Sequence, residues 1–119
     1  MTAATRERPN GNSGNTTRSP ACNRDEVVAT LREVEPELRA LGATAVFLYG
    51  SAARDEMNDE SDVDVFIDYD PDGPFSFVEF LDIRTLLSER LQRRLDLATR
   101  RGLNPRMKQR IEKTSLQVI

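Results

Sequence analysis

Four small polar positions near the middle of the chain have the types and spacing to do chemistry together. Gly50 and Ser51 follow a short apolar run, Ala45 to Tyr49, which is typical of a strand buried on both faces. Gly50 permits a sharp turn and close approach of another group to the backbone. Ser51 opens a predicted helical turn over residues 51–54, where free N–H groups and a hydroxyl can bind phosphate oxygens.

The other two positions are aspartates at the start of a second predicted strand, Asp62 to Tyr69. Asp62 and Asp64 are two residues apart, so their side chains share one face of the strand, while Val63 and Val65 point to the other. Paired carboxylates suit Mg²⁺, which takes oxygen ligands and shares them with phosphates. The alternative is a polar strand face turned to water.

A third aspartate could join this pair. Asp96 alternates with Leu95 and Leu97 in a predicted third strand, Arg94 to Ala98, and it faces the pair if that strand lies beside residues 62–66. Its alternative is a charge at a strand edge. Arg54 could reach a phosphate from the predicted helical turn, or it could be solvated. Asp68 and Asp70 are expected to be exposed residues at the end of the second strand.

The spacing of these groups resembles a known signature. Gly50-Ser51, ten intervening residues and then Asp62-x-Asp64 is similar to the pattern of the DNA polymerase β-like nucleotidyltransferases. Leu95-Asp96-Leu97-Ala98-Thr99 followed by Arg101-Gly102-Leu103-Asn104-Pro105, in so short a chain, resembles the minimal nucleotidyltransferases, the MNT or MntA-like antitoxins. The resemblance covers about residues 24–119.

The resemblance implies a fold, a reaction and a partner. The fold would be α+β, a small mixed sheet flanked by helices. The reaction would be Mg²⁺-dependent transfer of AMP from ATP to a tyrosine of a HEPN-domain RNase toxin, with which this antitoxin would form a hetero-oligomer. The residues implied are catalytic and metal-binding carboxylates, Asp62, Asp64 and Asp96, and nucleotide-binding residues, Gly50, Ser51 and Arg54.

Two other functions fit the same residues. The chain could neutralise a toxin by covering it, with a vestigial site, or it could modify a small molecule or an RNA end. One departure from the family bears on the rate of transfer. Relatives often have glycine after the arginine of the Gly-Ser segment, and here that position is Asp55, whose carboxylate could weaken nucleotide binding or face solvent.

Composition excludes several other chemistries. The chain has 119 residues, enough for one domain, and no histidine, so Ser–His–Asp catalysis and histidine metal ligands are absent. The single Cys22, a bystander thiol on composition, excludes an internal disulfide and cysteine zinc sites. A net charge of −3 gives no reason to expect direct nucleic-acid binding. No membrane span or signal peptide is visible, so a cytoplasmic protein is expected.

The remaining pattern predicts the elements that position the site. Residues 1–23 are polar and low in large apolar residues, which predicts a disordered tail before a domain over 24–119. Helices are predicted over 24–33, 36–41 and 76–92, the last with an inward stripe that includes Phe77, Phe80 and Leu81.

The chain after the third predicted strand is basic. A helix is predicted there, capped by Asn104 with Pro105 at its first position, with Met107 and Ile111 inward and an edge strand over 116–119 to follow. The basic residues of this part are a solvated helix face in the simplest interpretation, or they meet triphosphate or an acidic partner. They are Arg100, Arg101, Arg106, Lys108, Arg110 and Lys113.

Overall fold

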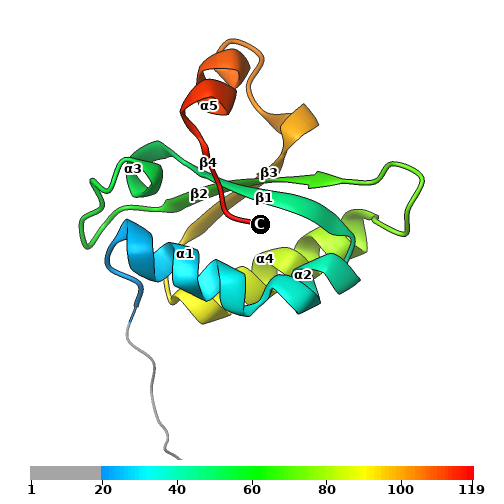
Figure 1. Cartoon of the computed structure of the whole chain (residues 1–119), viewed down its shortest axis with the longest axis horizontal. Coiled ribbons are helices and arrows are strands. Elements are labelled where there is room, and N and C mark those ends of the chain that lie inside the picture. Colours follow the sequence, from blue (N-terminus) through cyan, green and yellow to red (C-terminus); the bar gives the residue numbers. More distant parts are fainter. Residues whose placement is uncertain (1–19) are drawn as a thin grey trace, which may run out of the picture.

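The computed structural model describes residues 20–119, which form one layer of helices beneath a small sheet, with a C-terminal segment above it (Figure 1). In chain order the elements are α1 (Arg24–Glu33), α2 (Glu35–Ala40), β1 (Ala43–Tyr49), α3 (Gly50–Ala53), β2 (Val63–Tyr69), α4 (Phe77–Leu91), β3 (Leu95–Thr99), the 3₁₀ turn η1 (Arg100–Gly102), α5 (Lys108–Thr114) and β4 (Leu116–Gln117). The predicted α+β class is confirmed.

The sheet is mixed, with strand order β3-β2-β1-β4. β1 pairs antiparallel with β2 and with β4, whereas β2 and β3 run parallel, joined by the crossover through α4. The predicted neighbourhood of the second and third strands is therefore confirmed. It matters for the site because parallel pairing sets Asp64 opposite Asp96.

Helix ends follow local capping chemistry. The side chain of Asn23 accepts a hydrogen bond from the N–H of Glu26 (3.0 Å) at the start of α1, as the sequence predicts. Ser76 and Glu79 form a capping box before α4, and Gln92 ends that helix in the left-handed conformation. α2 begins one residue before Pro36, which occupies the first turn that proline tolerates.

The main core fills the space between the sheet and α1, α2 and α4. It takes the β2 residues Val63, Val65 and Ile67 from one face of that strand. Leu31, Leu38, Ile83, Leu87 and Leu91 of the helices close the layer, all fully buried. Ala21, before α1, is also buried and donates its N–H to the carbonyl of Leu91 (3.1 Å), so the packed domain begins ahead of Arg24.

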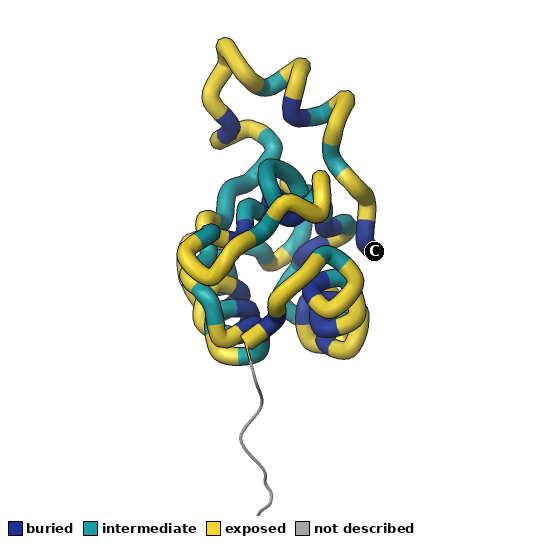
Figure 2. The backbone as a smooth tube through the Cα atoms, turned by 90° about the vertical axis from the view of Figure 1, so that its left-hand side faces the viewer, coloured by how far each residue is buried: buried dark blue, intermediate teal, exposed yellow. Residues whose placement is uncertain are grey.

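A second, smaller core lies on the opposite face of the sheet. Phe66 of β2 is fully buried there beneath Leu103 and Ile111 of the C-terminal segment. Figure 2 shows that most buried positions belong to the helix–sheet layer and few to the segment above it. The face that carries Asp64 is thus partly covered by the C-terminal segment.

Several predicted details are corrected. The last helix begins at Lys108, because Asn104 and Pro105 form a turn in which the Asn104 side chain accepts from the N–H of Arg106 (2.9 Å). Met107 is half exposed and does not point inward, although Ile111 does.

The other corrections concern the predicted stripe of the long helix and the ends of the chain. Phe77 and Leu81 of α4 are exposed, so the inward stripe of that helix is narrower than predicted and its buried residues are Ile83, Leu87 and Leu91. The predicted edge strand is two residues long. The tail prediction for residues 1–19 lies outside the described residues. Within residues 20–119, no helix is long and apolar enough to cross a membrane.

Candidate active site

The turn after β1 requires glycine at position 50. Gly50 has φ +70°, a conformation that side chains disfavour, and a Cβ there would collide with Oδ2 of Asp64. The chain therefore passes directly beside the carboxylate of the next strand and enters α3. Ser51 is half-buried in the first turn of α3, adjacent to this contact.

Sheet pairing brings two of the three predicted carboxylates together. Asp64 of β2 is in register with Tyr49 of β1 on one side and with Asp96 of β3 on the other. Paired residues on adjacent strands project from the same face, so the three side chains form a row across the sheet. The row starts at the Gly50 turn and ends at the edge strand.

The pKa of Asp64 reflects its partial burial and the negative charges of the neighbouring carboxylates. Partial burial, then the negative charges of Asp96 and Asp62, raise the pKa of Asp64 to about 6. Arg54 opposes the rise, which places its positive charge within electrostatic range of Asp64. The site thus holds an excess of negative charge that a cation would relieve.

Asp62 lies just before β2 and takes a different partner. Its Oδ1 forms an ion pair with Nε of Arg94 (2.9 Å), and its side chain is about half exposed. Among residues 20–119, no three acidic side chains converge into a ready metal-binding cluster. Asp64 and Asp96 therefore form the centre of the site, and Asp62 stands at its rim.

Arg54 and Asp55, which follow Ser51 closely in the chain, each contact another residue of the protein. Arg54 Nε pairs with Glu56 (2.9 Å) at the surface. Asp55 adopts φ +58°, which explains why a glycine suits this position in relatives. The Asp55 carboxylate accepts a hydrogen bond from the N–H of Arg24 (3.1 Å), at the start of α1. This carboxylate therefore has a structural partner in α1.

Tyr49 belongs to the site, although its residue type did not point to it. Burial, then Asp96 and Asp64, raise the pKa of the Tyr49 phenol to about 12, so it stays protonated at neutral pH. Its ring packs against Phe66 with centroids 5.7 Å apart. The sequence signal that could have identified Tyr49 was its position as the last strand residue before Gly50.

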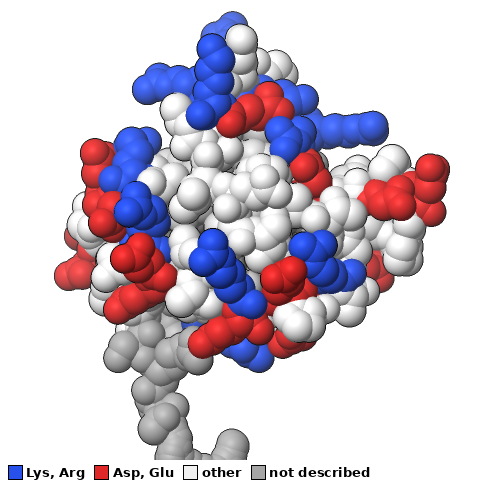
Figure 3. All heavy atoms as spheres, viewed as in Figure 1, with Lys and Arg blue, Asp and Glu red and all other residues white. Residues whose placement is uncertain are grey.

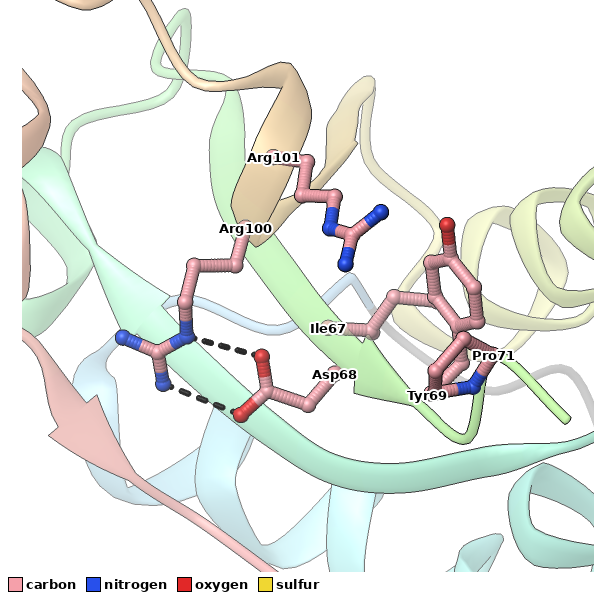
Figure 4. Close-up of a pocket in the computed structure, with 6 residues that line it drawn as sticks. All are labelled: Ile67, Asp68, Tyr69, Pro71, Arg100 and Arg101. Carbon is pink, nitrogen blue, oxygen red and sulfur yellow. Dashed lines mark hydrogen bonds and ion pairs between the residues drawn. The ribbon is translucent and has the colours of Figure 1, made fainter.

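The sequence also missed a hub that fixes the C-terminal segment. Arg100 of η1 makes two hydrogen bonds to Asp68 (2.8 and 3.0 Å), which Figure 4 shows, and a third to Glu112 of α5 (2.6 Å). Its guanidinium lies over the rings of Phe47 and Phe66, 4.9 and 5.1 Å from their centroids. Asp68 is therefore a half-buried anchor, and the prediction that it is an exposed strand end is wrong.

The donor set fits a hard divalent cation. Asp64 and Asp96 offer carboxylate oxygens on neighbouring strands, and after burial the charge of Asp96 is the next cause that raises the pKa of Asp64. Asp62 could add a third oxygen if it left Arg94. The absence of a side chain at Gly50 lets the Asp64 carboxylate pack directly against the backbone of the turn.

Comparison with known proteins defines the class. Residues 31–118, most of the chain, match the profile of the nucleotidyltransferase domain, so the chain belongs to that family. Its fold is that of a minimal nucleotidyltransferase: a solved structure described as a "putative minimal nucleotidyltransferase" superposes with TM-score 0.69 at 23% identity, over 79% of this chain and 94% of the other.

Two curated relatives come from Methanocaldococcus jannaschii. "Putative protein adenylyltransferase MJ1379" is 35% identical over 62% of this chain and 75% of its own length. "Putative protein adenylyltransferase MJ0126" is 30% identical over 78% of this chain and 95% of its own length. A further solved structure, a toxin-antitoxin complex with AMP-PNP, superposes with TM-score 0.57 at 18% identity, over 82% of this chain and 73% of the other.

Proposed function

We propose that this nucleotidyltransferase moves AMP from ATP to a hydroxyl, a tyrosine in the first instance, of a HEPN-type RNase toxin, and thereby acts as its antitoxin in the cytoplasm. The observation that carries the proposal is the row from the Gly50 turn through Asp64 to Asp96. The names of the relatives as protein adenylyltransferases, and the toxin-antitoxin structure with AMP-PNP, support the choice of reaction and partner.

Each residue has a proposed task in the transfer. The backbone at Gly50 and the Ser51 hydroxyl hold the β- and γ-phosphates, and Arg54 adds positive charge beside them. Asp64 and Asp96, joined by Asp62, hold Mg²⁺. When bound, Mg²⁺ neutralises charge that develops on the phosphates in the transition state. Phosphoryl transfer depends on such positioning more than on covalent help from the protein.

In this proposal the two substrates approach the row from opposite ends. With phosphates at the Gly50–Ser51 end, the acceptor hydroxyl enters at the Asp96 end, on the edge strand. Asp96 can there accept the proton that the hydroxyl loses as its oxygen bonds to the α-phosphorus and pyrophosphate leaves. Tyr49, kept protonated, stands beside Asp64 as a neutral neighbour.

The proposal is tested by following AMP and toxin activity together. The HEPN toxin is incubated with Mg-ATP and either wild type or Asp96→Asn, and its intact mass and RNA cleavage are measured. Wild type should add AMP and silence cleavage, whereas Asp96→Asn should bind the toxin without adding mass, because the acceptor's proton then lacks its carboxylate. Asp72→Asn, an exposed change in the β2–α4 turn, serves as the matched control.

The same experiment separates transfer from simple covering. An antitoxin that works only by occlusion would protect RNA equally well as wild type and as Asp96→Asn, with no mass added in either sample. That result would replace the transfer reaction with a binding role. Transfer of AMP to a small molecule or an RNA end, with the toxin mass unchanged, would correct the acceptor.

A further inference from the structure

Two pockets lie at the outer edge of the sheet, one at each end of β3 and both lined in part by α4, and together they are called the β3 groove below. β3 is an edge strand: β2 pairs with one side of it, and no strand within residues 20–119 pairs with the other. α4 packs beside β3. One stripe of that helix and its C-cap, with residues three or four apart, lines the pockets at the two ends of β3. The stripe comprises Phe77, Phe80, Arg84, Ser88 and Gln92.

The end of the groove beside Thr99 is apolar. Phe77 and Phe80 of α4 lie there with Phe75 and Tyr69, around a pocket that also reaches Thr99. The Phe77 side chain is 72% exposed, and its ring stacks on Phe80 with centroids 6.3 Å apart. Phe77 therefore places exposed apolar surface beside a pocket, and contiguous surface of this kind marks interaction sites.

The other end of the groove is polar and meets the active site. Asp96 and Asp62 line it, together with three arginines of α4 and the segment that follows. Arg94 is held by Asp62 (2.9 Å), and Arg93 donates to the carbonyl oxygen of Ser61 (2.8 Å) and to that of Asn58. Arg84 is exposed and has no ion pair within residues 20–119, so its charge is available to a ligand.

We propose that this β3 groove binds an extended segment of the acceptor protein, which adds to the edge of β3 as a further strand. The proposal rests on the proposed AMP transfer and specifies how its acceptor is recognised. The exposed strand edge supplies backbone hydrogen bonds, and the two ends of the groove supply selectivity, as in other strand-addition complexes. An acidic residue of the segment meets Arg84, close to the hydroxyl at Asp96.

The length of β3 sets the spacing of the recognised residues. The four steps from Leu95 to Thr99 cover about 13 Å at roughly 3.3 Å per residue. An acceptor segment should therefore carry an apolar side chain about three to four residues from its hydroxyl residue, to reach Phe77 and Phe80. Nucleic acid fits this groove less well, because it has no row of peptide N–H and C=O groups to pair with the free edge of β3.

Amide chemical shifts of the full-length chain test the groove without depending on transfer. The probe is a short synthetic peptide with a tyrosine, acidic residues beside it and a leucine at the predicted spacing. It should shift the amide resonances of Leu95–Thr99 and of the Arg84 turn saturably. A peptide with lysines in place of the acidic residues should bind about tenfold more weakly.

Two variants localise the effect. Arg84→Glu should weaken binding of the acidic peptide about tenfold and remove its advantage over the lysine peptide. Arg110→Glu makes the same charge change on an exposed residue of α5, on the other side of the sheet, and should leave both affinities unchanged. Phe77→Ser should weaken both peptides alike, because it alters only the apolar end.

Some results would overturn the β3 groove: no shift at high peptide concentration, shifts that lie elsewhere, or equal affinity for the two peptides. Stronger shifts of the same amides by a single-stranded oligoribonucleotide would do so as well, and would assign the groove to nucleic acid. The transfer reaction is rejected by a different result, which is the absence of AMP on the toxin. Peptide shifts in β3 with no transfer would keep the groove and reject the reaction.

Discussion

At the scale of single residues, the site depends on how closely charged groups are held together. Asp64 lies between Tyr49 and Asp96, and its neighbour Gly50 has no side chain to separate it from the turn. Folding therefore concentrates negative charge at one point, at a cost in stability that a bound cation would repay. Two predictions follow from this arrangement.

The first concerns pH. The pKa of Asp64 is raised from 3.8 to about 6, so the folded chain binds more protons than the unfolded chain between these values. The contribution of Asp64 to stability is therefore fully present below about pH 4 and is lost as pH rises through about 6. Because the group is about half exposed, we expect Asp64→Asn to raise the free energy of unfolding at neutral pH by about 1–2 kcal/mol.

Urea unfolding at a series of pH values measures this effect in metal-free protein. Wild type should lose stability across the window and Asp64→Asn should not, while Asp72→Asn in the exposed turn should behave as wild type. Equal pH dependence of all three proteins would show that Asp64 is not the titrating group. Mg²⁺ should bind wild type more tightly as pH rises through about 6, because the proton must leave first.

The second residue-scale prediction concerns Gly50. Gly50→Ala puts a methyl group against the Asp64 carboxylate in a backbone conformation that alanine disfavours. We expect a loss of about 1–3 kcal/mol in stability and a severe loss of AMP transfer, because Asp64 must move. Thermal unfolding and toxin mass together measure it. Gly73→Ala, in the turn before α4, where φ is not positive, is the control and should retain transfer.

At the scale of elements, one side chain adds polar contacts that fix the C-terminal segment over the sheet, beside the small core. Arg100 joins β2, η1 and α5 through Asp68 and Glu112, and it covers two aromatic rings of the sheet. Lysine cannot reproduce the two parallel hydrogen bonds to Asp68 or the stacking of a planar group.

We therefore expect Arg100→Lys to lower the free energy of unfolding by about 1–3 kcal/mol and to speed amide hydrogen exchange in α5. Exchange measured residue by residue should show the change concentrated in residues 100–117. Arg101→Lys is the matched control, because Arg101 is exposed and makes no ion pair among the described residues. Equal exchange in both variants would remove Arg100 from this role.

At the scale of the whole molecule, two cores of unequal size flank the sheet, and charge is unevenly distributed. The large core joins the helices to the sheet, and the small one holds the C-terminal segment. Figure 3 shows Lys and Arg gathered at the top, over the C-terminal segment, and Asp and Glu over the β2–α4 turn at the right. The active-site face thus has a basic cover that is less firmly packed than the layer beneath.

Cavity-forming substitutions in the two cores should therefore differ in their effects on stability and on hydrogen exchange. Leu87→Ala opens the large core and should destabilise the whole chain by about 2–5 kcal/mol, with faster exchange throughout. Ile111→Ala affects only the small core and should cost less, with faster exchange confined to α5 and β4. Hydrogen exchange of the two variants makes the comparison, and a global effect of Ile111→Ala would show one cooperative core.

The sequence by itself determined most of the elements, since they depend on local chemistry. Asn23 as a helix cap, the apolar run before Gly50 and the alternation around Asp64 and Asp96 are all readable from neighbouring residues. The predicted third strand proved to lie beside the second, which confirms the expected meeting of Asp64 with Asp96.

Only the tertiary structure decided which charges are partnered. Arg100 looked like one of several solvated basic residues, yet it binds Asp68, which lies 32 positions earlier in the chain. Phe77 looked like a core residue by its spacing, yet it is exposed and lines a surface pocket with Tyr69 and Thr99. Asp62 shares a face with Asp64 in sequence, yet it pairs with Arg94. Spacing fixes the face a residue occupies, whereas its partner depends on how distant segments pack.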